Sequence, residues 1–304
     1  MFRETWLWAS DKERVERFVT EGSLTRSVVQ RFIAGETAED AIAAIRQLNV
    51  KDIGGILDLL GEGVTDAVGA KQAFEDYLES VKRIEEAGVD TTVSVKLTQL
   101  GLAFDKPSCI AYVRGLATEG QAVGTSLEID MEQSEYVSET LDVFSTLRRE
   151  FPDLRLAVQA YLRRTPVDLE ELAKEAPPKV RLVKGAYAEG PDVAFQKRSE
   201  IDAQYRYLTD WLFEKGAHPG IASHDSSLIE HAQRAAARVG GGKKSFEIQM
   251  LYGIRRDLQE QLAREGYRVS VYVPFGCAWY AYLMRRIAER PANLRFFLRA
   301  VVRN

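Results

Sequence analysis

The sequence predicts a (β/α)8 TIM-type barrel that follows an N-terminal helical arm. Eight short apolar runs alternate with eight longer amphipathic, charge-rich stretches, which is typical of parallel β-α-β units. The repeat occupies residues 53–289, close to the ~250 residues typical of such a barrel. The apolar runs are 53–60, 92–98, 125–131, 154–161, 180–187, 220–223, 245–251 and 268–275. The amphipathic stretches are 66–87, 107–119, 135–150, 167–175, 190–215, 226–239, 254–265 and 277–289.

The segment before the first apolar run predicts helices only. Ser10 with Glu13, and Thr37 with Asp40, have the spacing of a capping box, in which a hydroxyl and a carboxylate satisfy the first backbone N–H groups of a helix. Apolar residues at helical spacing follow each pair. These signals predict an arm made of helices.

The main rival to the barrel is a doubly wound open sheet. Such a sheet normally carries a glycine-rich phosphate turn after its first strand, and none follows residues 53–60. The barrel is therefore favoured. Because no linker rich in Pro, Ser or Gly interrupts the repeat, we divide the chain into an arm of residues 1–50 and one catalytic barrel of residues 51–304.

Composition excludes several classes of protein. The 304 residues include 41 Lys+Arg and 45 Asp+Glu, a balance that argues against a generic nucleic-acid binder. Two cysteines and three histidines without H-E-x-x-H or C-x-x-C spacing predict that the chain binds no metal. The sequence contains no run of ~18 apolar residues, so it predicts no membrane span. We expect a cytoplasmic protein.

Every predicted strand carries a polar or ionisable residue near its carboxyl end. The chemistry of a barrel lies at these ends, so the side chains should converge on one mouth. Buried charges are costly unless paired, which leaves two interpretations: a functional site, or a structural layer of ion pairs and amides. Their convergence favours a site. The residues are Asp58, Lys96, Asp130, Gln159, Arg181 with Lys184, His224 with Asp225, Glu247 with Gln249, and Tyr272.

Spacing on two strands refines this prediction. Glu247 and Gln249 are two apart and therefore share one face of a strand. Arg181 and Lys184 are three apart and would face opposite ways on a regular strand. A break at Gly185 would let both reach the mouth.

The last predicted helix carries a polar stripe. Tyr282, Arg285, Arg286 and Glu289 fall at i, i+3, i+4 and i+7. Two interpretations stay open. The stripe is a solvated helix face with an Arg285–Glu289 pair worth ~0.3–0.5 kcal/mol, or the adjacent guanidiniums clamp a carboxylate or phosphate by forked hydrogen bonds.

Five segments together resemble the monofunctional bacterial form of proline dehydrogenase. They run in order through nearly the whole predicted barrel, from about residue 53 to 290, and so make a specific signal. The segments are Asp58–Glu62, Arg181–Tyr187 (RLVKGAY), Ala222–Asp225 (ASHD), Phe246–Gly253 (FEIQMLYG), and Val271–Gly276 (VYVPFG) followed by Tyr282–Arg286 (YLMRR).

The resemblance implies a flavoenzyme with bound FAD that oxidises L-proline to Δ1-pyrroline-5-carboxylate, the first step of proline catabolism to glutamate. Electrons would pass to a quinone or another acceptor. Further partners implied are the downstream pyrroline-5-carboxylate dehydrogenase and, for access to a quinone, peripheral contact with the inner face of the membrane. No nucleic acid is expected.

The resemblance also implies a role for individual residues. Asp130 and Arg181 match the positions that the family treats as catalytic, with Arg181 beside the flavin and Asp130 orienting Lys96 or Tyr272. The proline carboxylate would be clamped by Lys96, Arg285 and Arg286. The proline ring would be walled by Tyr272, Tyr282, Leu251 and Tyr187. Flavin contacts would come from Met131, Gln159, Lys184, Gly185, Ala186, Tyr187, Ser223 and His224.

Three further hypotheses come from the residues themselves. Lys96 or Lys184 could form a Schiff base in a flavin-free lyase or aldolase, although acidic neighbours would keep either lysine charged. A barrel-shaped scaffold with a purely structural mouth is the alternative that is not an enzyme. In the flavoenzyme, Glu62 on a glycine-flanked loop could pair with Arg285 and cover bound proline.

Overall fold

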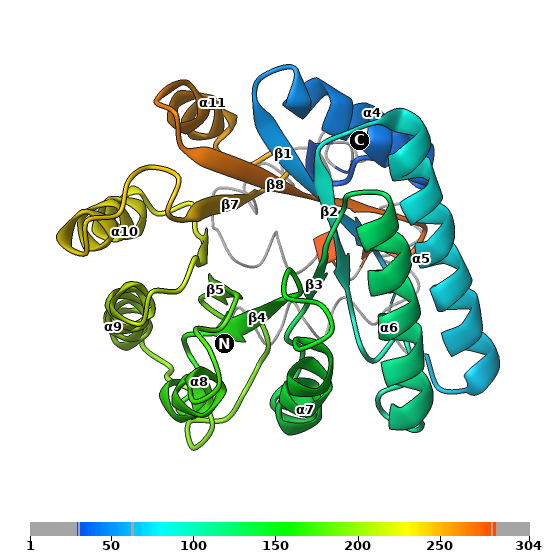
Figure 1. The fold of residues 1–304 in the computed structure, drawn as a ribbon, viewed down its shortest axis with the longest axis horizontal. Coiled ribbons are helices and arrows are strands. Elements are labelled where there is room, and N and C mark those ends of the chain that lie inside the picture. Colours follow the sequence, from blue (N-terminus) through cyan, green and yellow to red (C-terminus); the bar gives the residue numbers. More distant parts are fainter. Residues whose placement is uncertain (1–28, 30, 62–63, 281, 284–304) are drawn as a thin grey trace, which may run out of the picture.

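The computed structural model describes residues 29, 31–61, 64–280 and 282–283. Parallel strands form a closed barrel in the order β1 to β8, and the helices lie in a ring around it (Figure 1). The strands are β1 Ile53–Leu59, β2 Thr91–Val95, β3 Leu127–Ile129, β4 Arg155–Gln159, β5 Val180–Val183, β6 Gly220–Ala222, β7 Glu247–Leu251 and β8 Arg268–Phe275.

Pairing between the first and last strands closes the barrel. The register of β1 with β8 runs from Ile53 opposite Val269 to Leu59 opposite Phe275. Each strand also pairs in parallel with the next one along the chain. The predicted barrel is therefore confirmed, and the open doubly wound sheet is excluded.

The helices follow the strands in strict alternation. Helix α4 precedes β1, and a short 3-10 helix precedes α7. The elements are α4 Ala38–Asn49, α5 Ala67–Ala87, α6 Lys106–Ala122, η1 Ser134–Tyr136, α7 Val137–Leu147, α8 Thr165–Ala173, α9 Arg198–Glu214, α10 Ser226–Arg238 and α11 Arg256–Arg264.

Helix α4 begins with the capping box that the sequence predicts. The Thr37 hydroxyl accepts a hydrogen bond from the Asp40 N–H at 3.2 Å, and the Asp40 carboxylate accepts one from the Thr37 N–H at 3.1 Å. Ile45, on the same helix, is fully buried in the hydrophobic core, and the helix packs against β1 and β8. The second predicted capping box, Ser10 with Glu13, lies outside the described residues.

The predicted helix at 190–215 starts later than expected. Helix α9 begins at Arg198, because the residues before it make a different pairing. Ala194 forms an antiparallel bridge with Leu162, and the Phe195 N–H donates to the carbonyl of Tyr161 at 2.8 Å. The Phe195 N–H is thereby drawn into a strand-like contact and does not donate within a helix.

The last predicted helix, 277–289, is only partly within the described residues. Residues 279–280 and 282–283 are helical, whereas Cys277 and Ala278 are not. The remaining residues of this prediction lie outside the described part of the chain.

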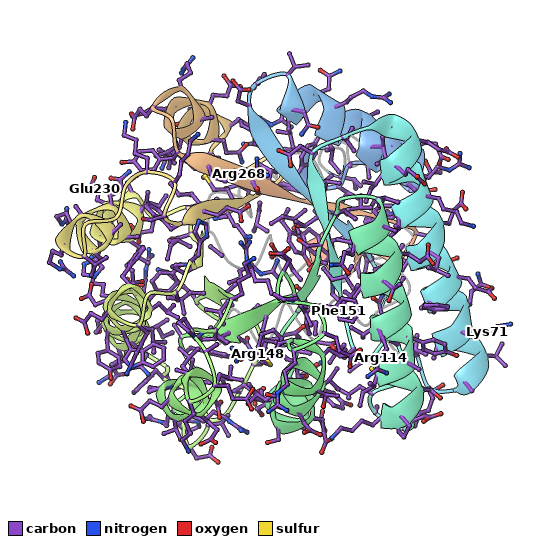
Figure 2. All side chains as sticks on the ribbon, in the orientation of Figure 1. Lys71, Arg114, Arg148, Phe151, Glu230 and Arg268 are labelled. Atoms are coloured by element: carbon purple, nitrogen blue, oxygen red, sulfur yellow. The ribbon has the colours of Figure 1, made fainter. Side chains whose placement is uncertain are left out.

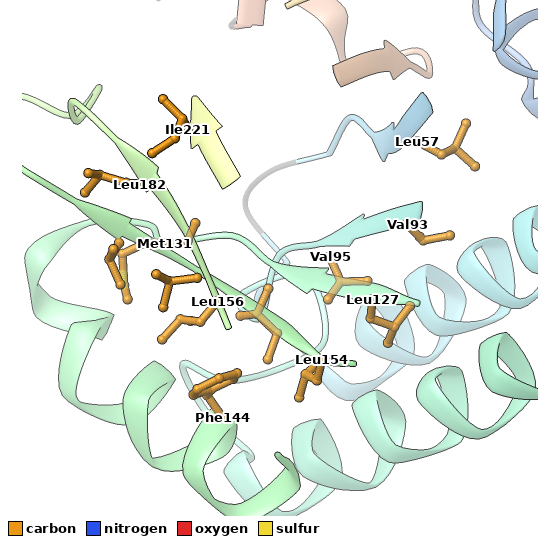
Figure 3. Packing of buried hydrophobic residues seen from close by; sticks show 14 of the residues in the cluster. Leu57, Val93, Val95, Leu127, Met131, Phe144, Leu154, Leu156, Leu182 and Ile221 are labelled. Atoms are coloured by element: carbon orange, nitrogen blue, oxygen red, sulfur yellow. The ribbon is translucent and has the colours of Figure 1, made fainter. Parts of the chain in front are cut away.

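The hydrophobic core lies between the strands and the helices. Successive strand residues point to opposite faces, and the outward-facing apolar ones, such as Leu57, Val93, Leu156 and Leu182, are buried towards the helices (Figure 3). Charged residues such as Lys71 project from the outer helices (Figure 2). This arrangement leaves the interior of the barrel to inward-facing side chains, many of them polar. Among the described helices, none has the length and apolar character needed to cross a membrane.

Candidate active site

Asp130 is the centre of a buried polar cluster at the carboxyl end of the barrel. It follows β3, and its Oδ1 accepts a hydrogen bond from the Ser94 hydroxyl at 2.6 Å. Its Oδ2 accepts one from the Tyr272 hydroxyl at 2.6 Å and lies 3.0 Å from Lys96 Nζ. Arg181 donates to Oδ1 through NH2. The resemblance implies that Asp130 orients Lys96 or Tyr272, and its carboxylate contacts both side chains.

Lys96 lies between two carboxylates. Its ammonium is 2.5 Å from Asp58 Oδ1 and 3.0 Å from Asp130 Oδ2, and it donates to the Tyr272 hydroxyl at 3.4 Å. Burial disfavours the charge, but Asp58, Tyr272 and Asp130 outweigh it and raise the pKa of Lys96 well above its ordinary value. Lys96 is therefore an ammonium at neutral pH.

The same environment determines the protonation of the other members of the cluster. Burial opposes the negative charge of Asp130, yet Lys96 and Arg181 lower the pKa of this carboxyl well below its ordinary range. Burial raises the pKa of the Tyr272 phenol well above its ordinary value. Burial also raises the pKa of Asp58, the second carboxylate against Lys96. Asp130 is thus an anion, and Tyr272 is a neutral hydrogen-bond donor.

Arg181 is a buried cation held at two of its nitrogens. NH2 donates to Asp130, NH1 lies 3.1 Å from Glu128 Oε2, and the guanidinium carbon is 5.2 Å from the centroid of the Tyr272 ring. Burial disfavours the charge, but the two carboxylates raise the pKa of Arg181 further. Within the described residues, neither Nε nor NH1 makes a hydrogen bond, so the contact of NH1 with Glu128 is an ion pair without hydrogen-bond geometry. A buried donor in that state costs about 1–3 kcal/mol until an acceptor reaches it.

Three members of this network were missed from the sequence: Glu128, Ser94 and Arg155. Glu128 is 1% exposed and lies 2.7 Å from Arg155 NH1, which in turn is 2.6 Å from Glu247 Oε2. Glu128 is two residues before Asp130, so the strand period places both in the barrel interior. That period was the available signal.

The chain turns sharply after β5, where the predicted flavin-binding stretch begins. Gly185 has φ +115°, a conformation that side chains rarely allow, and a Cβ there would lie 2.1 Å from Tyr161 Cδ1. Lys184 pairs with Asp202, and its Nζ is 3.8 Å from Asp225 Oδ2. The predicted break at Gly185 is present, but it directs Lys184 towards carboxylates of α9 and the start of α10, away from Asp130. Ala186 and Tyr187 follow, both half-buried.

Replacing Gly185 by Ala is expected to lower the free energy of unfolding by about 2 kcal/mol or more, because backbone strain of about 1–3 kcal/mol adds to the Tyr161 clash. Urea denaturation would measure it. Gly88→Ala is the matched control, since Gly88 also has positive φ (+59°) but no atom within 4 Å of a Cβ. Equal losses in the two variants would show that the Tyr161 contact is unimportant.

A second group of predicted residues meets at the ends of β6 and β7. His224 Nε2 accepts a hydrogen bond from the Leu251 N–H at 2.8 Å, so the proton of the neutral imidazole lies on Nδ1. The Ser223 hydroxyl accepts one from the Asp225 N–H at 3.1 Å. These contacts hold the Ser223–His224 pair against the adjacent strand end.

The other predicted contacts are distributed around the mouth. Gln159 is buried, and its Nε2 donates to the carbonyl of Glu132 at 2.9 Å. Met131 and Tyr282 are also buried. The remaining predicted residues, Glu62, Arg285 and Arg286, lie outside the described part of the chain.

Sequence comparisons point to one family. The family model described as "Proline dehydrogenase" matches residues 41–299. The chain is similar to Proline dehydrogenase 1 of Bacillus subtilis subsp. natto, with 34% identity over 303 residues and 100% of each chain covered. It is also similar to Proline dehydrogenase of Deinococcus radiodurans, with 36% identity over 308 residues, 100% of this chain and 98% of that protein.

A solved structure shares the fold. Proline utilization A (PutA) from Bdellovibrio bacteriovorus, inactivated by N-propargylglycine, superposes with a TM-score of 0.83 and 26% sequence identity. The match covers 97% of this chain and 37% of that one, so the present chain spans about a third of the larger protein's length.

Proposed function

The chain belongs to the proline dehydrogenase family, an oxidoreductase family acting at the first step of proline catabolism, and from that premise we propose that it oxidises L-proline to Δ1-pyrroline-5-carboxylate with FAD. The amino acid loses two electrons and two protons as the ring C–N bond becomes a C=N bond. A bound FAD would supply the two-electron acceptor, and the chain's own residues would position and charge-stabilise the reactants.

The observation that carries the proposal is the charge state of the Asp130 cluster. Lys96 and Arg181 stay cationic, Asp130 anionic and Tyr272 neutral, because each shift in pKa moves the group further from neutral pH. Groups in these states transfer protons poorly. They suit a reaction in which a hydride leaves and fixed charges orient the reactants and stabilise developing charge.

The residues at the mouth fit a flavin. The buried Arg181 Nε–H lacks an acceptor within the described chain, and the isoalloxazine ring offers acceptors along its polar edge. We propose that Arg181 lies beside this edge, where a cation favours the negative charge of the reduced ring. The proposed flavin contacts are Met131, Gln159, Lys184, Gly185, Ala186, Tyr187, Ser223 and His224.

The proposed substrate site is on the other side of Asp130. Lys96, held as an ammonium, would bind the proline carboxylate together with Arg285 and Arg286. Tyr272, Tyr282 and Leu251 would wall the ring. Asp130 acts here through Lys96 and Tyr272, since its Oδ2 contacts both side chains.

We further propose that the electrons pass to a quinone or a similar acceptor, which peripheral contact with the inner face of the membrane would make accessible. The product would pass to pyrroline-5-carboxylate dehydrogenase. Family membership supports both proposals. Similarity to the bifunctional protein PutA of Escherichia coli, 26% identical over 321 residues, supports the second.

The competing Schiff-base lyase is disfavoured by the same geometry. A nucleophilic lysine needs a lowered pKa, whereas the two carboxylates around Lys96 raise its pKa. Lys184 forms an ion pair with Asp202. The environment of Lys96 therefore does not favour the neutral amine.

The test is spectroscopic. The purified protein, reconstituted with FAD, should be yellow and should bleach when L-proline is added without oxygen, with Δ1-pyrroline-5-carboxylate formed in equal amount. A colourless protein that borohydride traps covalently with substrate would support the lyase. If the protein bound neither flavin nor proline, only the hypothesis of a structural scaffold would remain.

Replacing Arg285 or Arg286 by Met is expected to raise the KM for proline about 30-fold or more, because loss of a charge-assisted hydrogen bond to a carboxylate costs ~2 kcal/mol. FAD absorbance should be retained. Steady-state kinetics would measure it, with Arg264→Met as the control because Arg264 lies in the last turn of α11. Parent-like KM values in both variants would refute the clamp.

A further inference from the structure

Glu128 lies directly against the guanidinium of Arg181. Its Oε2 is 3.1 Å from Arg181 NH1, while Asp130 accepts from NH2 of the same side chain. Both carboxylates come from the β3 segment, two residues apart and on the same side of the strand. The Glu128 contact is an ion pair without hydrogen-bond geometry. Together with Asp130 it places an anion beside each of two guanidinium nitrogens, which favours one orientation of the guanidinium plane.

Glu128 is itself firmly held. It is 1% exposed, and Oε1 accepts hydrogen bonds from Arg155 NH1 at 2.7 Å and from Gln249 Nε2 at 2.9 Å. Side chains from β4, β5 and β7 thus converge on one carboxylate of β3. A group with partners on three other strands occupies a defined position in the barrel and can transmit that position to Arg181.

The charges show why a carboxylate is needed there. Asp130 contacts two cations, Lys96 and Arg181, and one anion cannot neutralise both. Asp58 forms a second ion pair with Lys96 and so neutralises part of its positive charge. Glu128 supplies the further negative charge next to Arg181.

We propose that Glu128 is a positioning residue for proline oxidation: it sets the orientation of the Arg181 guanidinium, while Arg155 and Gln249 hold Glu128 in place. This inference rests on the proposed function, in which Arg181 lies beside the flavin. The competing explanation is that Glu128 only completes a structural ion pair with Arg155.

Glu247 provides a matched control. It is a buried carboxylate that also pairs with Arg155, at 2.6 Å, but the structure gives it no contact with Arg181. Glu128→Gln and Glu247→Gln each remove one buried negative charge from Arg155, so a purely structural role predicts similar effects. Only Glu128→Gln changes the contact with Arg181.

The experiment measures proline kinetics, the flavin midpoint potential and the thermal unfolding temperature of both variants with FAD bound. Glu128→Gln should lower kcat about tenfold or more with little change in KM, because misplacement of a positioned group affects the reaction step more than binding. Its flavin potential should rise, since a lost negative charge favours the reduced ring. Glu247→Gln should lose similar thermal stability but keep a kcat near that of the parent.

The variant Glu128→Asp separates the effect of the carboxylate's position from the effect of its charge. It also replaces Glu128→Gln in the test if that variant does not fold. It keeps the negative charge on a shorter side chain, so the potential should stay near that of the parent while kcat falls. Equal kcat losses in Glu128→Gln and Glu247→Gln, or a parent-like kcat in Glu128→Asp, would overturn the inference and leave the proposed function intact. A parent protein whose flavin is not reduced by proline would overturn both.

Discussion

Asp130→Ala is expected to lower the kcat for proline about a hundredfold, because misplacement of positioned groups can cost that much. The same change should lower the free energy of unfolding by about 3–5 kcal/mol, since it leaves the buried cations Lys96 and Arg181 without their shared partner. Steady-state kinetics and urea denaturation would measure the two effects.

Asp130→Asn separates charge from shape. The amide retains the volume but removes the negative charge, and its single oxygen can accept from only one of the two hydroxyls, Ser94 or Tyr272, that donate to the two carboxylate oxygens. A loss of activity close to that of the Ala variant would assign the effect to charge. Glu139→Gln is the surface control: Glu139 pairs with Lys106 and its side chain is 50% exposed, so its effect on stability should stay below about 1 kcal/mol.

The stabilising effect of Asp130 should depend on pH with a defined sign. The pKa of this carboxyl is lower in the folded protein than the ordinary value of 3.8. The unfolded state therefore binds more protons in the window below pH 3.8, and the stabilisation is lost as pH falls through that window. The difference in unfolding free energy between the parent and Asp130→Asn should shrink on acidification below pH 3.8. A difference that is constant with pH would contradict this assignment.

Arg181→Met is expected to lower kcat by about 10²–10³-fold, the effect of losing one preorganised donor that stabilises developing charge. The KM for proline should change much less, because the clamp proposed for the carboxylate uses other cations. The flavin midpoint potential should fall, since a buried positive charge that favours the reduced ring is removed. Rapid-reaction kinetics under anaerobic conditions would isolate the reduction step.

Arg181→Lys tests whether charge alone is sufficient. Lysine keeps the positive charge but has no planar fork with which to contact Asp130 and Glu128 together. We expect a potential closer to that of the parent and a kcat between those of the parent and Arg181→Met. If Arg181→Met keeps a kcat within tenfold of the parent, Arg181 does not have the proposed role.

The fold could be predicted from the sequence because its signals are local. Strand and helix periods depend on residues a few positions apart, and eight alternations of the correct total length indicate a barrel. The capping box at Thr37 was read in the same way and is confirmed. The predicted start of α9 was wrong by eight residues, because residues 193–195 pair with residues 161–163. No local pattern in either segment indicates this contact.

The sequence by itself determined the barrel, the polar residue at each strand end and, through its ordered motifs, the family. Only the tertiary structure decided which of those residues are partners. Asp130 contacts Lys96, Tyr272 and Arg181 together, and Glu128 lies against the same arginine. Lys184, in contrast, turns away towards Asp202. The physical reason is that the position of a side chain along the barrel axis depends on the stagger between neighbouring strands. That stagger is set by pairing between segments far apart in the sequence, and not by the spacing of residues within one strand.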